Sequence, residues 1–172
     1  IQGVGKVGAA LVRWLTHTYG ADVVIADVNP QAIKQVKTTF PSVKVVPYHD
    51  ILSIDCDILA PCALGGVLNT DSIPLLKCQI VAGSANNQLE SYEAGLMLAE
   101  RGILFAPDFV INAGGLIDAY TEMQGYDYQM ALAKTTGIKV TMLNILAESQ
   151  ESKSPPFVCA EIEAQKILNE GV

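Results

Sequence analysis

Three glycines near the start of the chain have the spacing of a phosphate-binding turn. Gly3, Gly5 and Gly8 form the pattern G-x-G-x-x-G. In such a turn the first glycine permits a tight bend, the second lets a pyrophosphate approach the backbone, and the third lets the next helix pack closely on the strand. The helix N-terminus then directs free N–H groups at the phosphates. The predicted dinucleotide site begins with Gly3, Val4, Gly5, Lys6, Val7 and Gly8.

A carboxylate follows at the distance that this kind of site requires. Asp27 ends a short apolar run, 19 positions after Gly8. A carboxylate at the end of the second strand accepts hydrogen bonds from the adenosine ribose, and it repels a 2′-phosphate. We therefore expect NAD rather than NADP as the ligand, with Val28 in the same site. The alternative is an ordinary aspartate that caps the helix starting near Pro30.

Three later segments follow predicted strands and carry small or amide side chains. They span residues 60–66, 83–88 and 107–115. In an open α/β sheet, ligands bind beyond the carboxyl ends of the strands. Asn86, Asn87 and Asn112 each offer a donor and an acceptor, which suits a carboxamide such as that of nicotinamide. The alternative is that these asparagines only form turns.

Strand-like and helix-like runs alternate along the first 106 residues. The patterns predict strands over 22–27, 43–46, 57–60, 79–82 and 103–106, and helices over 6–19, 30–39, 71–76 and 89–100. Short connections between alternating elements indicate βαβ units. The expected fold class is α/β, a Rossmann-type, doubly wound and mostly parallel sheet with additional C-terminal helices.

The residues beyond Pro107 read as helical. We expect helices over 116–123 and 128–149, a polar linker over 149–156, and a last amphipathic helix over 161–169. Because no further strands follow for these helices to cover, we expect them to pack on a partner domain or subunit. The chain divides on this basis into a dinucleotide-binding domain, residues 1–125, and a helical extension, residues 126–172.

Composition excludes several other classes of function. The net charge of −7 over 172 residues argues against binding to nucleic acid or to a membrane surface. No apolar run approaches the roughly 18–20 residues that span a bilayer.

The cysteines predict no metal site, because the sequence has no C-x-x-C pair and no histidines near them. They are expected to be free thiols in a reducing cytoplasm. These cysteines are Cys56, Cys62, Cys78 and Cys159.

The segments after the strands resemble the cofactor domain of the Glu/Leu/Phe/Val amino-acid dehydrogenases, with the leucine dehydrogenase branch as the nearest match. The resemblance rests on A-P-C-A-L-G-G, G-S-A-N-N-Q and P-D-F-V-I-N-A-G-G, in this order after V-G-K-V-G, and it covers residues 1–126. It implies reversible oxidative deamination of an L-amino acid with NAD, giving a 2-oxo acid and ammonia. A branched-chain, leucine-like substrate is expected, and the choice among leucine, valine, isoleucine and phenylalanine stays open.

The same resemblance implies a role for each segment. The glycine turn would hold the pyrophosphate and Asp27 the adenosine ribose. Leu116 and Ala119, one helical turn apart, would line the side-chain pocket of the substrate, although ordinary helix packing is the alternative for both. The nicotinamide and its ribose would lie near Cys62, Ala63, Ala85, Asn86 and, at the carboxamide, Asn112.

The resemblance also implies that the catalytic residues lie elsewhere. In this family the catalytic lysines and aspartate belong to a separate N-terminal domain. Only two residues precede Gly3, whereas a central strand has about five or six. We therefore expect a fragment that begins inside its first strand, lacks that domain and is inactive alone, from an enzyme that forms a homo-oligomer. The alternatives are a non-catalytic NAD-sensing module and, at the same turn, a site for adenosyl-methionine or flavin.

Overall fold

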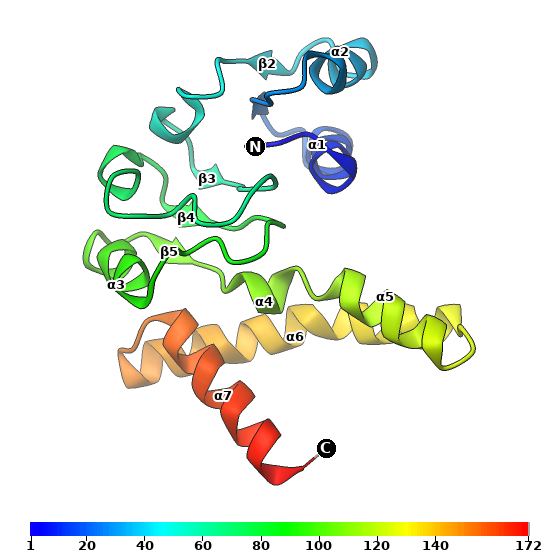
Figure 1. The fold of residues 1–172 in the computed structure, drawn as a ribbon, viewed down its shortest axis with the longest axis vertical. Coiled ribbons are helices and arrows are strands. Elements are labelled where there is room, and N and C mark those ends of the chain that lie inside the picture. The colour runs from blue at the N-terminus through cyan, green and yellow to red at the C-terminus, as the bar shows by residue number, and fades with distance from the viewer. Residues whose placement is uncertain (172) are drawn as a thin grey trace.

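The computed structural model describes residues 1–171 as parallel strands flanked by helices (Figure 1). The strands pair in register, with Ile25 opposite Val45, Leu59 opposite Val81, and Val81 opposite Phe105. Each strand is short and lies inside the range predicted for it. Their bounds are β1 Val24–Ile25, β2 Lys44–Val45, β3 Ile58–Leu59, β4 Ile80–Val81 and β5 Leu104–Phe105.

Gln2 joins the strands into one sheet. It forms a parallel bridge with Ala26 on one side and with Pro61 on the other. Its backbone N–H donates to the carbonyl of Ala60 at 2.9 Å, and its carbonyl accepts from the N–H of Cys62 at 2.7 Å. The order across the sheet is β2, β1, Gln2, β3, β4, β5, which is the 3-2-1-4-5-6 order of dinucleotide-binding sheets. The predicted fold class is confirmed.

Helices cover both faces of this sheet. Helices α1 (Lys6–Tyr19) and α2 (Pro30–Thr39) lie on one side of the strands, and α3 (Tyr92–Glu100) lies on the other (Figure 1). The first two have the predicted bounds. Helix α3 begins later than predicted because the Ser91 hydroxyl caps it, accepting from the N–H of Ala94 at 3.3 Å. Two short 3-10 helices, η1 (Ile51–Ser53) and η2 (Ile73–Leu75), complete the connections.

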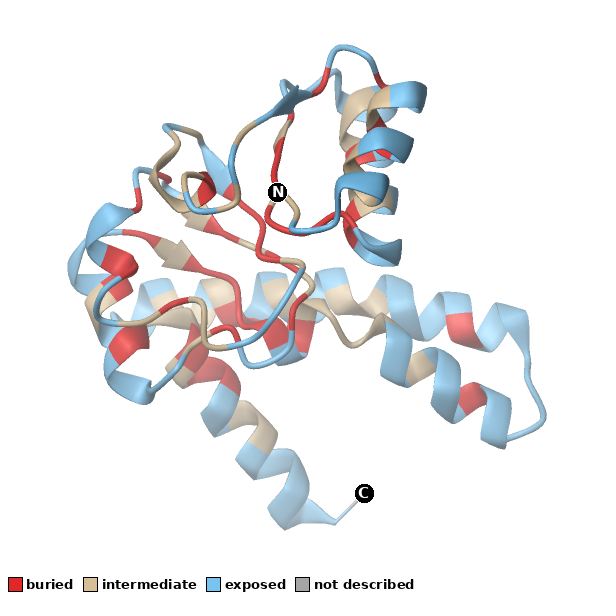
Figure 2. Ribbon diagram, turned by 45° about the horizontal axis from the view of Figure 1, so that its top comes forward, coloured by how far each residue is buried: buried red, intermediate tan, exposed pale blue. Residues whose placement is uncertain are grey.

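Two of the three apolar clusters within residues 1–171 lie against the sheet, one on each side, and the third joins later helices through Val110, Ile145 and Cys159. Figure 2 shows the buried residues along the strands and on the inner faces of the helices. The first cluster joins α1 and α2 to β1 through Val12, Val36 and Ile25. The second joins α3 to β4 and β5 and includes Leu98 and Val81. Burial of aliphatic side chains on both faces is what a parallel sheet requires.

Within residues 1–171, four helices follow β5: α4 (Asp108–Ile111), α5 (Gly114–Met123), α6 (Tyr128–Ser152) and α7 (Pro156–Glu170). Helix α5 and the first part of α6 form a hairpin that projects from the body (Figure 1) and is mostly exposed (Figure 2). The carboxylate of Asp127 starts α6 by accepting from the N–H of Gln129 at 2.8 Å.

The predicted linker over residues 149–156 is wrong. Helix α6 continues to Ser152, whose hydroxyl donates to the carbonyl of Glu148 at 2.8 Å. Lys153 then ends the helix in the left-handed conformation, with φ of 57°. Because α7 already begins at Pro156, only three residues separate the two helices.

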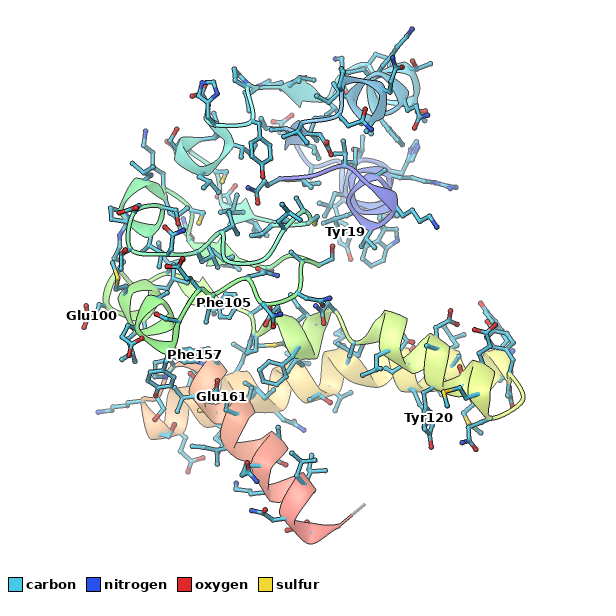
Figure 3. The ribbon with its side chains drawn as sticks, viewed as in Figure 1. Tyr19, Glu100, Phe105, Tyr120, Phe157 and Glu161 are labelled. Carbon is cyan, nitrogen blue, oxygen red and sulfur yellow. The ribbon has the colours of Figure 1, made fainter. Side chains whose placement is uncertain are left out.

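The expectation that the C-terminal helices have no strand to cover is wrong for α7. Phe157 is buried in the same cluster as Phe105 of β5 (Figure 3). Its ring packs edge-to-face on Tyr92 at 5.2 Å between centroids. Gly95 of α3 makes room for it, because a Cβ at this position would lie 2.7 Å from the phenyl ring. Helix α7 therefore packs against the sheet, and the division at residue 125 stays a prediction.

Candidate functional site

The three glycines of the first turn have different surroundings. Gly3 has φ of +92°, and a Cβ on it would lie 2.8 Å from the Cβ of Ala63. A Cβ on Gly8 would lie 2.1 Å from the carbonyl oxygen of Gly3. A Cβ on Gly5 would have no atom within 4 Å. Gly3 and Gly8 are therefore required by the chain's own packing, whereas the space at Gly5 is open to a ligand.

The N-terminus of α1 follows this open position. Gly5 is the N-cap residue and supplies no side chain, and the first turn of the helix has no acidic residue. The backbone N–H groups at the start of a helix need an acceptor from outside it. Lys6 and Val7 are exposed beside them. The arrangement suits an anion, which the helix dipole attracts.

Asp27 is bound to this turn. Its Oδ2 accepts from the N–H of Val4 at 2.7 Å, and its Oδ1 accepts from the N–H of Asn29 at 2.7 Å. The alternative that Asp27 caps α2 is wrong, because the side chain of Asn29 does so by accepting from the N–H of Gln31 at 3.0 Å. The half-buried carboxylate of Asp27 thus stands at the end of β1, beside the exposed Val28.

Cys62 and Ala63 lie directly against the glycine turn. Besides the contact of Ala63 at Gly3, a Cβ on Gly8 would lie 3.4 Å from the Cβ of Cys62. Cys62 is half-buried and Ala63 is exposed. The segment after β3 therefore forms the other wall of the turn, as expected for adjacent strand ends.

Two of the predicted asparagines lie in contact. Nδ2 of Asn112 donates to Oδ1 of Asn86 at 2.6 Å and approaches the carbonyl of Ala85 at 3.4 Å. Within residues 1–171, Nδ2 of Asn86 and Oδ1 of Asn112 have no hydrogen-bond partner, so the pair offers one donor and one acceptor. Asn87 forms a turn instead, with φ of 52° and a carbonyl that accepts from the N–H of Gly66 at 2.7 Å.

Two buried polar residues beneath this pair received no role from sequence reasoning. Gln88 is fully buried and Asp108 is 9% exposed. The N–H of Gln88 donates to Oδ2 of Asp108 at 2.8 Å. A signal for Asp108 was present, because an acidic residue directly after a proline is favoured in the first turn of a helix, and Asp108 is the first residue of α4. No local pattern marks Gln88.

Gln2 is a third buried residue that sequence reasoning missed. Its side chain is 3% exposed and donates from Nε2 to the hydroxyl of Tyr48 at 3.2 Å. This contact fixes the loop after β2 to the central strand. It lies one residue before Gly3, so it supports the position of the glycine turn.

The predicted substrate residues lie on α5, shortly after Asn112 in the chain. Leu116 and Ala119 are both exposed on α5, and 75% of the Leu116 surface is accessible. A cleft of about 490 Å³ lies nearby, between α4 and α6, and is lined by Ile111, Thr135, Thr136, Ile138, Lys139, Met142 and Leu143.

Neither a metal centre nor a membrane span is present in the part of the chain that the structure describes. Among residues 1–171, no three or more His, Cys, Asp or Glu side chains gather closely enough to hold a metal ion. In the same range, no helix combines the length and apolar character needed to cross a bilayer. The four cysteines are free.

Comparison with known proteins identifies the family. The sequence profile of the Glutamate/Leucine/Phenylalanine/Valine dehydrogenases matches residues 1–152. The chain belongs to this dehydrogenase family. Its members depend on a nicotinamide cofactor, which agrees with the donor and acceptor that Asn86 and Asn112 present. The resemblance stated from the sequence is confirmed.

The relatives include dehydrogenases with different amino-acid substrates in their names. The chain is 47% identical over 152 residues to L-tryptophan dehydrogenase of Nostoc punctiforme, covering 88% of this chain and 42% of the relative. It is 42% identical over 168 residues to leucine dehydrogenase of Bacillus subtilis, covering 98% of this chain and 46% of the relative. It is 43% identical over 172 residues to valine dehydrogenase of Streptomyces coelicolor, covering 99% of this chain and 47% of the relative. The chain thus spans less than half the length of these relatives.

Solved structures give the same result. The crystal structure of L-tryptophan dehydrogenase from Nostoc punctiforme has a TM-score of 0.93 and 43% identity, and the match covers 99% of this chain and 51% of that one. A hetero-hexameric glutamate dehydrogenase from Thermus thermophilus has a TM-score of 0.71 at 19% identity, covering 100% and 47%, which shows the fold alone. All of these proteins are dehydrogenases, so the comparisons give no support to the NAD-sensing alternative.

Proposed function

We propose that this chain is the cofactor-binding part of an NAD-dependent amino-acid dehydrogenase. The reaction would be the reversible oxidative deamination of a branched-chain, leucine-like L-amino acid to its 2-oxo acid and ammonia. The observation that carries the proposal is the hydrogen bond between Asn112 and Asn86. It joins two amide side chains, which would bind a carboxamide, at the same sheet edge as the glycine turn and Asp27.

The glycine turn would hold the pyrophosphate. The open space at Gly5 and the uncapped N-terminus of α1 fit an anion that approaches the backbone. Cys62 and Ala63 would line the same side of the dinucleotide, because they pack against Gly3 and Gly8. Lys6 is exposed at the turn, where its charge would favour phosphate without taking part in the reaction.

Asp27 would select NAD over NADP. Its two oxygens already accept from Val4 and Asn29, so the carboxylate is held in place before any ligand arrives. Each oxygen still has lone-pair capacity for a ribose hydroxyl. A 2′-phosphate at this position would be repelled by the negative charge, whereas a hydroxyl would be bound.

The asparagine pair would orient the nicotinamide. Nδ2 of Asn86 would donate to the carboxamide oxygen, and Oδ1 of Asn112 would accept from the carboxamide nitrogen. When bound, NAD would accept the hydride that leaves the α-carbon of the amino acid. The role of this chain would be to fix one ring orientation, with Ala85 in the surrounding wall.

The remaining parts of the enzyme would come from outside this chain or from further copies of it. We assign no catalytic acid or base to residues 1–172, and we propose that these groups lie in the portion of the relatives' length that the chain does not match. Leu116 and Ala119, both exposed, would complete the substrate pocket against that portion. A cytoplasmic homo-oligomer is the proposed state of the full-length enzyme.

Two measurements test this function. The chain should bind NADH, followed by fluorescence titration, and should bind NADPH much more weakly; equal binding would remove the role of Asp27. The full-length product of the gene should oxidise NADH with ammonia and the 2-oxo acids of leucine, valine or isoleucine. The panel should also include phenylpyruvate and indole-3-pyruvate. Failure with every branched-chain and aromatic 2-oxo acid would refute the dehydrogenase proposal.

A further inference from the structure

Asp108 and Gln88 are hydrogen-bonded to each other and to the segment that carries Asn86. Asp108 begins α4 and Gln88 lies in the segment after β4. Oδ2 of Asp108 accepts from the N–H of Gln88 at 2.8 Å, and the backbone carbonyl of Asp108 accepts from the N–H of Asn112 at 2.8 Å. The side chain of Asp108 therefore holds the segment that carries Asn86, while its backbone carbonyl makes the i→i+4 bond that closes α4 at Asn112.

The side chain of Gln88 is hydrogen-bonded to the backbone just before Asn86. Its Nε2 donates to the carbonyl of Gly83 at 2.8 Å and to that of Ala85 at 3.0 Å. Ala85 immediately precedes Asn86, and its carbonyl is also the second acceptor near Nδ2 of Asn112, at 3.4 Å. The contacts thus run from Asp108 through Gln88 and Ala85 to Asn112, and back to Asp108.

We propose that Asp108 and Gln88 are positioning residues that hold Asn86 and Asn112 in the geometry that orients the nicotinamide carboxamide. The inference rests on the proposed function of the asparagine pair. Neither Asp108 nor Gln88 would touch the cofactor. Both are buried and act through the two asparagines, which remain accessible.

The chemistry of Asp108 supports a role beyond starting α4. The ion pairs within residues 1–171 do not include this carboxylate, so its hydrogen bonds are to neutral backbone groups: the N–H of Gln88 and, at 2.9 Å, the N–H of Phe109. Burial of a carboxylate without a cation is unfavourable unless such bonds satisfy it. A hydroxyl or a neutral amide at this position would offer a single acceptor atom. The carboxylate differs in offering two acceptor oxygens, one for each segment.

The orientation of both amides follows from this arrangement. Because the Ala85 carbonyl is an acceptor only, the atom of Asn112 that faces it must be Nδ2, and Oδ1 then points away. The Asn86 atom that accepts from Nδ2 must be Oδ1, which leaves Nδ2 of Asn86 for a ligand. If Gln88 no longer held the Ala85 carbonyl in place, Asn112 would lose the acceptor that selects this orientation of its amide.

The test compares two ligands that differ only in the nicotinamide end. NADH contains the carboxamide, whereas ADP-ribose keeps the pyrophosphate and both riboses. In Asp108→Ala the affinity for NADH should fall about tenfold, while the affinity for ADP-ribose stays within about twofold of wild type. Asp108→Asn, which keeps one acceptor for Gln88, should restore NADH binding to within about threefold of wild type. Asp71→Ala, at an exposed carboxylate, is the matched control.

A second readout needs no cofactor. The side-chain amide resonances of Asn112 in a ¹⁵N spectrum should shift, and exchange faster with water, in Asp108→Ala. If Asp108→Ala does not fold, Gln88→Met carries the same test with a side chain of similar size and no amide. Unchanged Asn112 resonances, or equal losses of NADH and ADP-ribose binding, would overturn the positioning role. If the wild-type chain bound NADH no more tightly than ADP-ribose, the proposed function would be refuted. The Asn112 resonances would still decide whether Asp108 positions that side chain.

Discussion

Nδ2 of Asn112 and Oδ1 of Asn86 lie 2.6 Å apart although 26 positions separate the two residues. They follow different strands, β5 and β4, which pair directly in the sheet. Parallel pairing therefore brings two separate segments to one edge, and the hydrogen bond fixes them to each other. The remaining donor, Nδ2 of Asn86, and the remaining acceptor, Oδ1 of Asn112, belong to different segments. Neither segment alone could therefore bind both polar atoms of a carboxamide.

The first prediction concerns this pair. Asn86→Ala should weaken NADH binding about tenfold, because it removes one direct hydrogen bond and frees the side chain of Asn112. Binding of ADP-ribose should not change. Asn87→Gly is the matched control, since Asn87 has φ of 52°, a conformation that glycine adopts readily. Calorimetric titration of both ligands checks the prediction, and an equal loss for the two ligands would contradict it.

The second prediction separates two glycines of one turn. Gly8→Ala should lower the free energy of unfolding by about 1–3 kcal/mol or more, because its Cβ would lie 2.1 Å from the Gly3 carbonyl. Gly5→Ala should change this free energy by only about 1 kcal/mol or less, since its Cβ meets nothing within 4 Å. It should nevertheless weaken NADH binding at least about tenfold, because the methyl group takes the space of the pyrophosphate. Urea unfolding and NADH titration measure the two effects, and wild-type affinity in Gly5→Ala would contradict the assignment.

The order of elements and the glycine turn could be predicted because they depend on local patterns. Gly20 adopts the left-handed conformation that ends α1, and Asn29 caps α2. Both signals lie within a few residues of the helix that they end or start. The bounds of these two helices were therefore predicted correctly from the sequence.

The missed features depend on contacts between distant residues. Phe157 docks on the sheet because Gly95, 62 positions earlier, leaves space for its ring. Asp108 and Gln88 have a role only because β4 and β5 are neighbours. The false linker has a different cause. Its serines are polar in sequence, but Ser149 donates to the carbonyl of Ser154 at 2.6 Å and so supports the end of α6.

The third prediction is a change in cofactor preference. Asp27→Asn should reduce the preference for NADH over NADPH about tenfold, because it removes the charge that repels a 2′-phosphate. Stability should fall by only about 1 kcal/mol, since an amide oxygen retains one of the two backbone contacts. Asp22→Asn, at an exposed carboxylate before β1, tests for a general effect of charge. If both variants shift the ratio equally, Asp27 has no direct contact with the ribose.

The fourth prediction concerns the docking of α7. Phe157→Ala should lower the free energy of unfolding by about 3–5 kcal/mol, because the ring is 3% exposed and contacts the core of the sheet. Ile162→Ala on the same helix should cost less than about 1 kcal/mol, since Ile162 is 47% exposed. Chemical denaturation followed by circular dichroism gives both values. Equal costs would mean that α7 does not contribute to the folded core in solution.

The fifth prediction is a loss of stability at high pH. Burial raises the pKa of Cys78 above its ordinary value of 9.0, and it raises the pKa of Cys56 in the same direction. Below about pH 7.5 both thiols are almost entirely neutral in the folded and unfolded chains. As the pH rises further, the unfolded chain loses these protons first, so the free energy of unfolding falls until the folded thiols ionise as well. The slope for one thiol is at most about 1.4 kcal/mol per pH unit.

Cys78→Ala isolates this contribution from other groups that titrate at high pH. The variant should be less stable than wild type at pH 7.5, because Cys78 is 6% exposed and packs in the core. Between pH 8.5 and pH 10, however, its free energy of unfolding should fall less steeply than that of wild type. Urea unfolding at a series of pH values provides both slopes, with Cys159→Ala as a second buried cysteine for comparison. Parallel slopes for wild type and Cys78→Ala would show that the Cys78 thiol ionises alike in the folded and unfolded chains.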